Sequence, residues 1–138
     1  MEKTSEDIEA DVYRILRDSA LKKAIGGQVL RDGRRKKGAT TEDAVVKFLS
    51  GIDGQEQSGV VLIHIYVPNK AFSDDGELSK DTPRIRELQR VVNNVIANDF
   101  DSNTEYVFEK DGTPQSYPVE GIEQHFINVR LKYRRKTF

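Results

Sequence analysis

Cysteine is absent from this chain of 138 residues, and its absence excludes several kinds of chemistry at once. A chain without cysteine has no disulfide framework, no thiolate nucleophile, and no zinc or iron–sulfur centre built on cysteine ligands. The folded state must therefore be held together by side-chain packing and by non-covalent polar contacts.

Long hydrophobic runs are also missing. Residues Met1–Asp11 are polar and acidic, without the basic start and apolar run of a secretory signal, and no stretch approaches the roughly 20 apolar residues of a membrane span. We therefore expect a cytoplasmic protein that makes no contact with a membrane.

Neither sign of charge is in excess. Lys and Arg number 22 and Asp and Glu number 23, so the formal net charge is -1 and no global field attracts nucleic acid. An apolar content of 36% beside a charged content of 33% is typical of a globular domain whose elements bury one face. The length is close to the commonest domain size, which predicts a single domain over residues 1–138.

No motif for catalysis or cofactor binding is present. The sequence has no G-x-S-x-G elbow and no glycine-rich phosphate loop, and Asp74-Asp75-Gly76 lacks the ligand spacing of a calcium loop. His64 and His125 lie in separate predicted strands and could bind a metal with Glu123. However, a histidine inside an apolar strand is more often a hydrogen-bonded core residue. We therefore expect no enzymatic activity, no cofactor and no metal.

Helical periodicity occurs in two segments. Ser5–Arg17 places Ile8, Val12, Ile15 and Leu16 on one stripe. Asp18 and Ser19 could interrupt or recap the helix before Ala20–Ile25, and Gly26-Gly27 ends it. A second helix is predicted from Pro83 to Ala97, with Thr82 as its cap.

Six strands complete the predicted fold, and the polar segment Asn69–Thr82 is expected to be an irregular connection. The C-terminal tail Arg135–Phe138 is expected to be mobile. Thr104–Glu109 and Thr113–Tyr117 are predicted to form a β-hairpin around Asp111-Gly112, and Gly51–Gly59 to connect another pair. The strands are Gln28–Arg31, Ala44–Leu49, Gly59–Val67, Thr104–Glu109, Thr113–Tyr117 and His125–Tyr133. This order predicts an α+β fold, with two helices on one side of a mainly antiparallel sheet.

Basic side chains form the strongest local polar feature. One cluster lies in the predicted loop Asp32–Thr41 and the other in the last strand and tail, where only Tyr133 is aromatic. Both clusters can contact phosphate, pair with acidic surface on a neighbouring copy or partner, or simply be solvated. The residues predicted to contact a partner or DNA are Arg31, Arg34, Arg35, Lys36, Lys37, Lys132, Arg134 and Arg135.

Apolar residues occupy both faces of the strand Ala44–Leu49. Val46 and Phe48 share one face with Ala44, while Val45 and Leu49 lie on the other. This excess of apolar surface indicates either an interface between subunits or ordinary burial beneath the second helix.

Several short signatures together resemble the tail-terminator and tail-completion proteins of long-tailed phages and their prophage relatives. These signatures span most of the chain and match the family in element order and hydrophobic pattern. The chain departs from the family at Gln28, where a basic residue often follows the two glycines, and in the basic loop Arg34–Lys37. The signatures are Val12-Tyr13-Arg14-Ile15-Leu16, Ala24-Ile25-Gly26-Gly27 leading into Val29, the strand Val60–Val67, the helix Pro83–Ala97, and the strand from His125-Phe126 to Tyr133.

The resemblance implies a structural subunit rather than an enzyme. Proteins of this family form a ring, often a hexamer, at the head-proximal end of the tail tube, where they stop polymerisation and contact head-completion proteins. It implies a homo-oligomer that assembles in the host cytoplasm and ends in the virion, with the basic loop facing DNA in the lumen or an acidic partner. The alternative is a nucleic-acid-binding module that uses the loop 31–37 and the basic C-terminal strand on phosphates.

Overall fold

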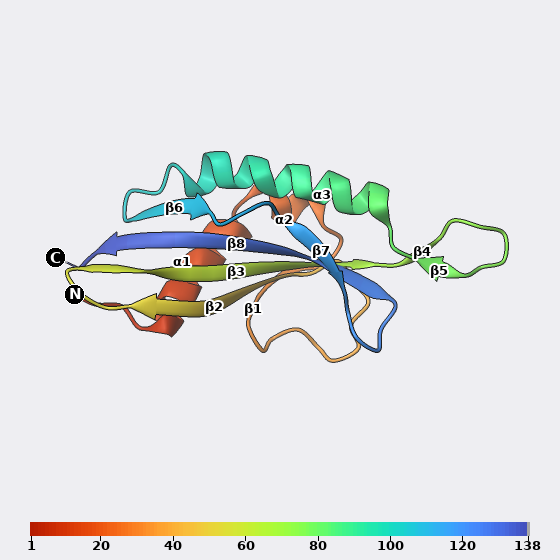
Figure 1. Cartoon of the computed structure of the whole chain (residues 1–138), viewed down its shortest axis with the longest axis horizontal. Helices are drawn as coiled ribbons and strands as arrows, with labels where there is room; N and C mark the ends of the chain where they lie inside the picture. The colour runs from red at the N-terminus through yellow and green to blue at the C-terminus, as the bar shows by residue number, and fades with distance from the viewer. Residues whose placement is uncertain (138) are drawn as a thin grey trace.

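The computed structural model describes residues 1–137 and contains a mixed six-stranded sheet with helices on one face (Figure 1). The strand order is β1-β2-β3-β8-β6, and β7 also pairs with β8. Only β1 and β2 are parallel, and the other neighbours are antiparallel. The predicted α+β class is confirmed. The strands are β1 Val29–Arg31, β2 Ala44–Ile52, β3 Glu56–Pro68, β6 Tyr106–Lys110, β7 Gln115–Pro118 and β8 Gln124–Lys136.

Strands β3 and β8 pair along their whole length. Each has 13 residues, and the register runs without a shift from Glu56 opposite Lys136 to Pro68 opposite Gln124. Because side chains alternate along a strand, every second residue of both strands faces the helices. The other residues form what we call the open face, made by Val60, Leu62, His64 and Tyr66 of β3 with Phe126, Asn128, Arg130, Lys132 and Arg134 of β8.

Helix α1 has the predicted bounds Ser5–Arg17, lies behind the sheet in Figure 1 and begins at a capping box. The Asp7 backbone N–H donates to Thr4 Oγ1 at 3.1 Å, and the Thr4 N–H donates to the Asp7 carboxylate at 3.0 Å. The short helix α2, Ala20–Ala24, follows after Ser19, whose hydroxyl caps it. The chain therefore recaps at Ser19 between the two helical segments, which the sequence allowed.

Helix α3, Thr82–Val95, begins one residue before the predicted Pro83. Its cap is Asp81 rather than the predicted Thr82, because the Asp81 carboxylate accepts from the Arg84 backbone N–H at 3.2 Å. A π-helical turn, η1 Ile96–Phe100, continues it past the predicted end and buries Phe100.

The hydrophobic core lies between the helices and one face of the sheet. It joins the inner positions of β2, β3 and β8 to the apolar stripes of the helices. Side chains with no measurable exposure include Val12, Leu16, Val46, Val61, Ile63, Ile65, Leu88, Val92, Ile127, Val129 and Leu131. No helix in residues 1–137 is both long and apolar enough to cross a membrane.

The predicted hairpin between Thr104–Glu109 and Thr113–Tyr117 is wrong. β6 pairs with the late residues of β8 and β7 with its early residues, so the two strands lie end to end along the same edge. Between the two strands the chain stays beside β8, because the Asp111 backbone N–H donates to the Arg130 carbonyl oxygen at 2.8 Å.

Two further predictions about connections are corrected. The expected mobile tail Arg135–Phe138 contributes Arg135 and Lys136 to β8, opposite Gln57 and Glu56, while Phe138 lies outside the described residues. β2 and β3 also extend further than expected, so their connection is residues 53–55 rather than Gly51–Gly59.

The segment Asn69–Thr82, predicted to be irregular, contains a second small sheet. Its strands are β4 Lys70–Ala71 and β5 Leu78–Ser79, which project beyond the end of the main sheet at the right of Figure 1. We call residues 70–79 the arm. Strands of two residues are too short for a periodic signal, so the pattern did not reveal them.

Gly59 is expected to be essential for the close approach of β2 and β3. A Cβ atom at this position would overlap the backbone of Ser50 and Gly51, which has no rotamer to change. Gly59→Ala should therefore lower the free energy of unfolding by about 1–3 kcal/mol in urea denaturation. Gly54→Ala is the control, because its Cβ would come no nearer than 3.6 Å to another atom, and it should change stability by less than about 0.5 kcal/mol. Equal stabilities would contradict this register.

Candidate functional site

Three of the eight basic residues predicted to contact a partner form close ion pairs with carboxylates inside the chain, and a fourth, Lys132, lies 3.9 Å from Asp111. Arg31 Nε lies 3.0 Å from the buried carboxylate of Glu9, and Arg135 Nε lies 2.7 Å from Glu105. Arg35 is the third. These arginines link elements that are distant in sequence, so their positive charge stabilises the fold and is not free to bind a partner.

Arg35 fixes the loop of residues 32–43 against the sheet. Its Nε lies 2.9 Å from the Asp43 carboxylate, and its guanidinium stacks 4.0 Å from the centre of the Tyr66 ring on the open face. Both charged side chains are nearly buried, at 12% exposure for Arg35 and 6% for Asp43. The guanidinium also donates to three further oxygens, those of the Ala39 carbonyl, the Thr41 carbonyl and the Gln124 amide.

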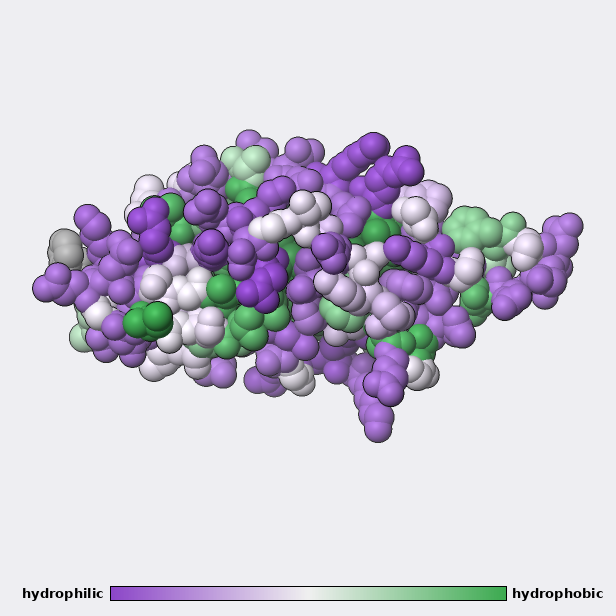
Figure 2. Space-filling view, viewed as in Figure 1, coloured by the Kyte–Doolittle hydropathy of each residue, from purple (hydrophilic) through white to green (hydrophobic). Residues whose placement is uncertain are grey.

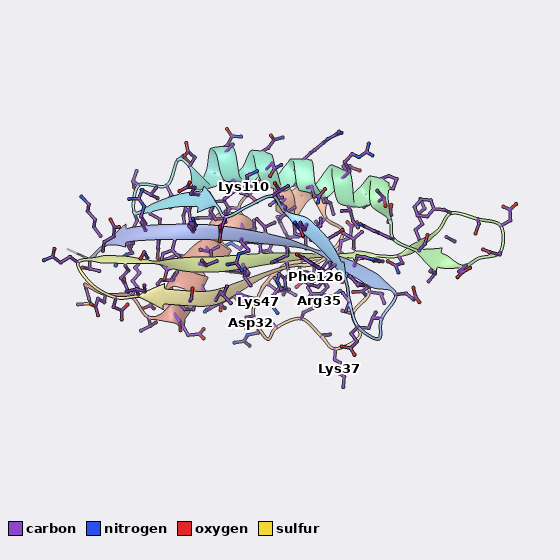
Figure 3. The ribbon with its side chains drawn as sticks, viewed as in Figure 1. Asp32, Arg35, Lys37, Lys47, Lys110 and Phe126 are labelled. Atoms are coloured by element: carbon purple, nitrogen blue, oxygen red, sulfur yellow. The ribbon has the colours of Figure 1, made fainter. Side chains whose placement is uncertain are left out.

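The other five predicted residues are exposed but form two separate groups. Arg34, Lys36 and Lys37 lie in the loop 32–43, from which Lys37 projects away from the body (Figure 3). Lys132 and Arg134 lie towards the far end of β8. Gln124 lies beside Arg35, and Lys132 follows it eight positions later in β8. Because a strand rises about 3.3 Å per residue, the two positions are roughly 26 Å apart.

An aromatic cluster lies on the open face, and no pattern in the sequence indicates it. Phe126 lies at its centre, with ring centroids 4.6 Å from His64, 5.9 Å from Tyr66 and 5.7 Å from Tyr117. These rings come from three strands, so only the pairing of β8 with β3 and β7 brings them together. Figure 2 shows this side of the molecule as a mixture of polar and apolar surface.

The two histidines do not form a common site. His64 belongs to the open face, whereas the register places His125 opposite Val67, on the other side of the sheet. Burial, assisted by the positive charge of Lys47, lowers the pKa of His64 to about 4, so its ring is neutral at neutral pH. Among residues 1–137, no three His, Asp or Glu side chains are grouped so that they could hold a metal ion.

The arm combines exposed apolar side chains with an acidic tip. Phe72 is 54% exposed and Leu78 is 46% exposed. Asp74, Asp75 and Glu77 lie between them in the turn, which closes at Gly76 with a φ of 76°. In Figure 2 the projecting arm shows apolar surface near its base and polar surface at its end.

The outer part of β2 forms an unpaired edge. β1 pairs only with Ala44–Val46, and no other strand of residues 1–137 covers the rest of β2 on that side. Ala44, Val45 and Val46 are buried, but the helix that contacts β2 is α1 rather than the predicted second helix. Leu49 is 48% exposed and Ile52 is 72% exposed. The register also shifts between Phe48 and Ser50, where a β-bulge interrupts the pairing with β3.

No model of a known protein family matches the chain, and no curated protein matches it in sequence.

Removal of the Arg35 guanidinium is expected to destabilise the protein strongly. Arg35→Leu would leave the Asp43 carboxylate buried without its cation, which should lower the free energy of unfolding by about 3 kcal/mol in urea denaturation. Arg34→Leu is the matched control, because this exposed neighbour has no carboxylate partner in residues 1–137, and its effect should stay within about 0.5 kcal/mol. If both variants lost the same stability, Arg35 would have no special role in fixing the loop.

Proposed function

We propose that this protein is a structural assembly subunit of a phage or prophage tail, of the tail-terminator or tail-completion type, and that its copies associate into a ring. One observation carries the proposal. Apart from Met1, every large apolar side chain that is exposed in residues 1–137 lies on a strand or on the arm, and none lies on a helix. The surface suited to association is therefore concentrated at the edges of the sheet and at its projecting end.

The edge of β2 supports this proposal because it offers unpaired backbone groups beside apolar side chains. An exposed strand edge can add a strand from another chain, which gives main-chain hydrogen bonds, and side chains such as Leu49 and Ile52 then add apolar contact. The β-bulge after Phe48 and the charge of Lys47 oppose uncontrolled pairing. An edge of this kind suits a specific neighbour.

The arm supports the ring in particular. It projects from one end of the body, and in this proposal it docks on a different surface of the neighbouring copy. Such a head-to-tail contact between two different surfaces forms a closed ring when the rotation between copies closes. The exposed Phe72 and Leu78 would be the buried apolar anchors of this contact.

The assignment to a phage tail rests on the family resemblance, and the fold is compatible with it. The body is α+β, which is the fold class that the resemblance implies. In this proposal the ring contacts tail-tube and head-completion proteins, assembles in the host cytoplasm and remains in the virion. The protein has no catalytic role in this proposal.

The second candidate function is a nucleic-acid-binding module. Arg34, Lys36 and Lys37 favour it, because they are exposed and have no carboxylate partner in residues 1–137. The separation of this group from Lys132 and Arg134 argues against one continuous track for a nucleic-acid strand. Affinity for DNA that falls steeply with salt, without ring formation, would favour this candidate.

Replacement of the two apolar side chains of the arm is expected to prevent association. Light scattering of the wild-type protein over a range of concentrations should give a mass that is a multiple of one chain, and negative-stain electron microscopy should show rings. The double variant Phe72→Ser and Leu78→Ser should shift the mass to that of a single copy, because the contact loses its apolar anchors.

Arg86→Ser provides the control for this experiment. Arg86 is an exposed residue of α3 on a helical surface that the proposal does not use, so this variant should associate like the wild type. A wild-type mass of one copy at every concentration would refute the assembly role. Rings that persist in the double variant would show that the arm is not part of the contact, and the edge of β2 would then be the remaining candidate.

A further inference from the structure

A pocket of about 480 Å³ lies between α2, the segment that follows it, and the loop 32–43. We call it the basic pocket. Its charged lining consists of Lys22 from α2, Arg34, Arg35 and Lys36 from the loop, and Asp43. The basic loop residues stand out in the sequence, whereas Lys22 joins them only because α2 packs beside the loop.

The basic pocket holds four cationic side chains but only one carboxylate, and that carboxylate is already fully engaged. Asp43 accepts from Arg35 at 2.9 Å, from the Thr41 hydroxyl at 2.8 Å and from the Gln28 backbone N–H at 2.9 Å. Its charge is therefore balanced by Arg35.

The remaining three cations have no counter-charge in the pocket. Arg34 and Lys36 form no ion pair in residues 1–137, and Lys22 donates only a long hydrogen bond of 3.4 Å to the Gly27 carbonyl oxygen. The whole chain carries a formal charge of only -1, so this accumulation of positive charge is local. A concave surface lined by one sign of charge focuses the field and raises the local concentration of ions of the opposite sign.

The backbone that carries these cations is held in place. Arg35 contacts the middle of the loop through the Ala39 carbonyl oxygen and its end through Asp43, and it stacks on the Tyr66 ring of the sheet. Arg34 and Lys36 are the neighbours of Arg35 in the sequence, so the backbone that carries their side chains is held in place as well. A binding site whose backbone is already ordered loses less entropy when its ligand binds.

We propose that the basic pocket binds a phosphate group. A phosphate has several acceptor oxygens and up to two negative charges, which matches Arg34, Lys36 and Lys22 better than a single carboxylate would. The volume falls within the range of small-ligand sites, so there is room for a group attached to the phosphate. The phosphate can come from a free phosphorylated small molecule or from the backbone of a nucleic acid. This inference does not depend on how copies of the chain associate.

Isothermal titration with inorganic pyrophosphate, at constant low ionic strength, tests the proposal. The wild-type protein should bind pyrophosphate, and Lys22→Gln, Arg34→Gln and Lys36→Gln should each weaken the affinity about tenfold, because each removes one charge-assisted contact. The triple variant should show no binding. All three side chains lie at the surface of the pocket, so thermal unfolding should confirm that the variants remain folded.

The double variant Lys132→Gln and Arg134→Gln is the matched control, because it removes exposed positive charge at the other end of the sheet. Its affinity for pyrophosphate should equal that of the wild type. The absence of pyrophosphate binding to the wild type, or an equal loss of affinity in the control, would overturn the proposal. The proposal would also be overturned if the triple variant bound pyrophosphate as tightly as the wild type.

Competition with a short oligothymidylate then distinguishes the two sources of phosphate. Displacement of pyrophosphate by the oligonucleotide, with an affinity that falls as salt rises, would assign the site to a nucleic-acid backbone. Binding of pyrophosphate without such competition would assign it to a free phosphorylated molecule. The mass of the triple variant by light scattering should equal that of the wild type, so loss of this site is distinguishable from loss of assembly.

Discussion

Thirteen residues of β3 lie opposite thirteen residues of β8, and this pairing decides on which side of the molecule each later feature lies. Alternation along the strands sends Ile63 and Val129 into the core and sends His64 and Lys132 to the open face. A shift of one residue would exchange the two sets. The paired strands also run along the length of the body (Figure 1). The arm leaves β3 at one end of the body, and both ends of the described chain lie at the other end.

The helices cover only one face of the sheet, so the other face is stabilised differently. A loop crosses it there, fixed by one arginine whose charge is matched by Asp43 and whose flat guanidinium rests on Tyr66. A buried ion pair of this kind contributes little net stability over an apolar contact, but its hydrogen bonds allow only one arrangement of the loop. The loop can therefore be polar and exposed and still present its remaining basic side chains in fixed positions.

The sequence predicts the parts of this fold that depend on local periodicity. The helix Ser5–Arg17, the central strand Gly59–Val67 and the α+β class follow from the spacing of apolar residues, and the structure confirms them. Pairing between distant segments has no such signal, so β7 was assigned to the wrong partner. The roles of the arginines were hidden for the same reason: Arg34 and Arg35 are adjacent and chemically identical, and only the position of Asp43 and Tyr66 decides which of them is buried.

The arm leaves the body at Asn69 and returns at Lys80 without contributing a residue to the hydrophobic core. Its sequence is therefore almost free of the packing constraints that act on β3 and β8. Substitutions in residues 70–79 can alter what the protein recognises at little cost in stability, whereas those in the core cannot. Related chains should consequently diverge fastest in this segment, and exchange of the arm between them should transfer recognition from one chain to another.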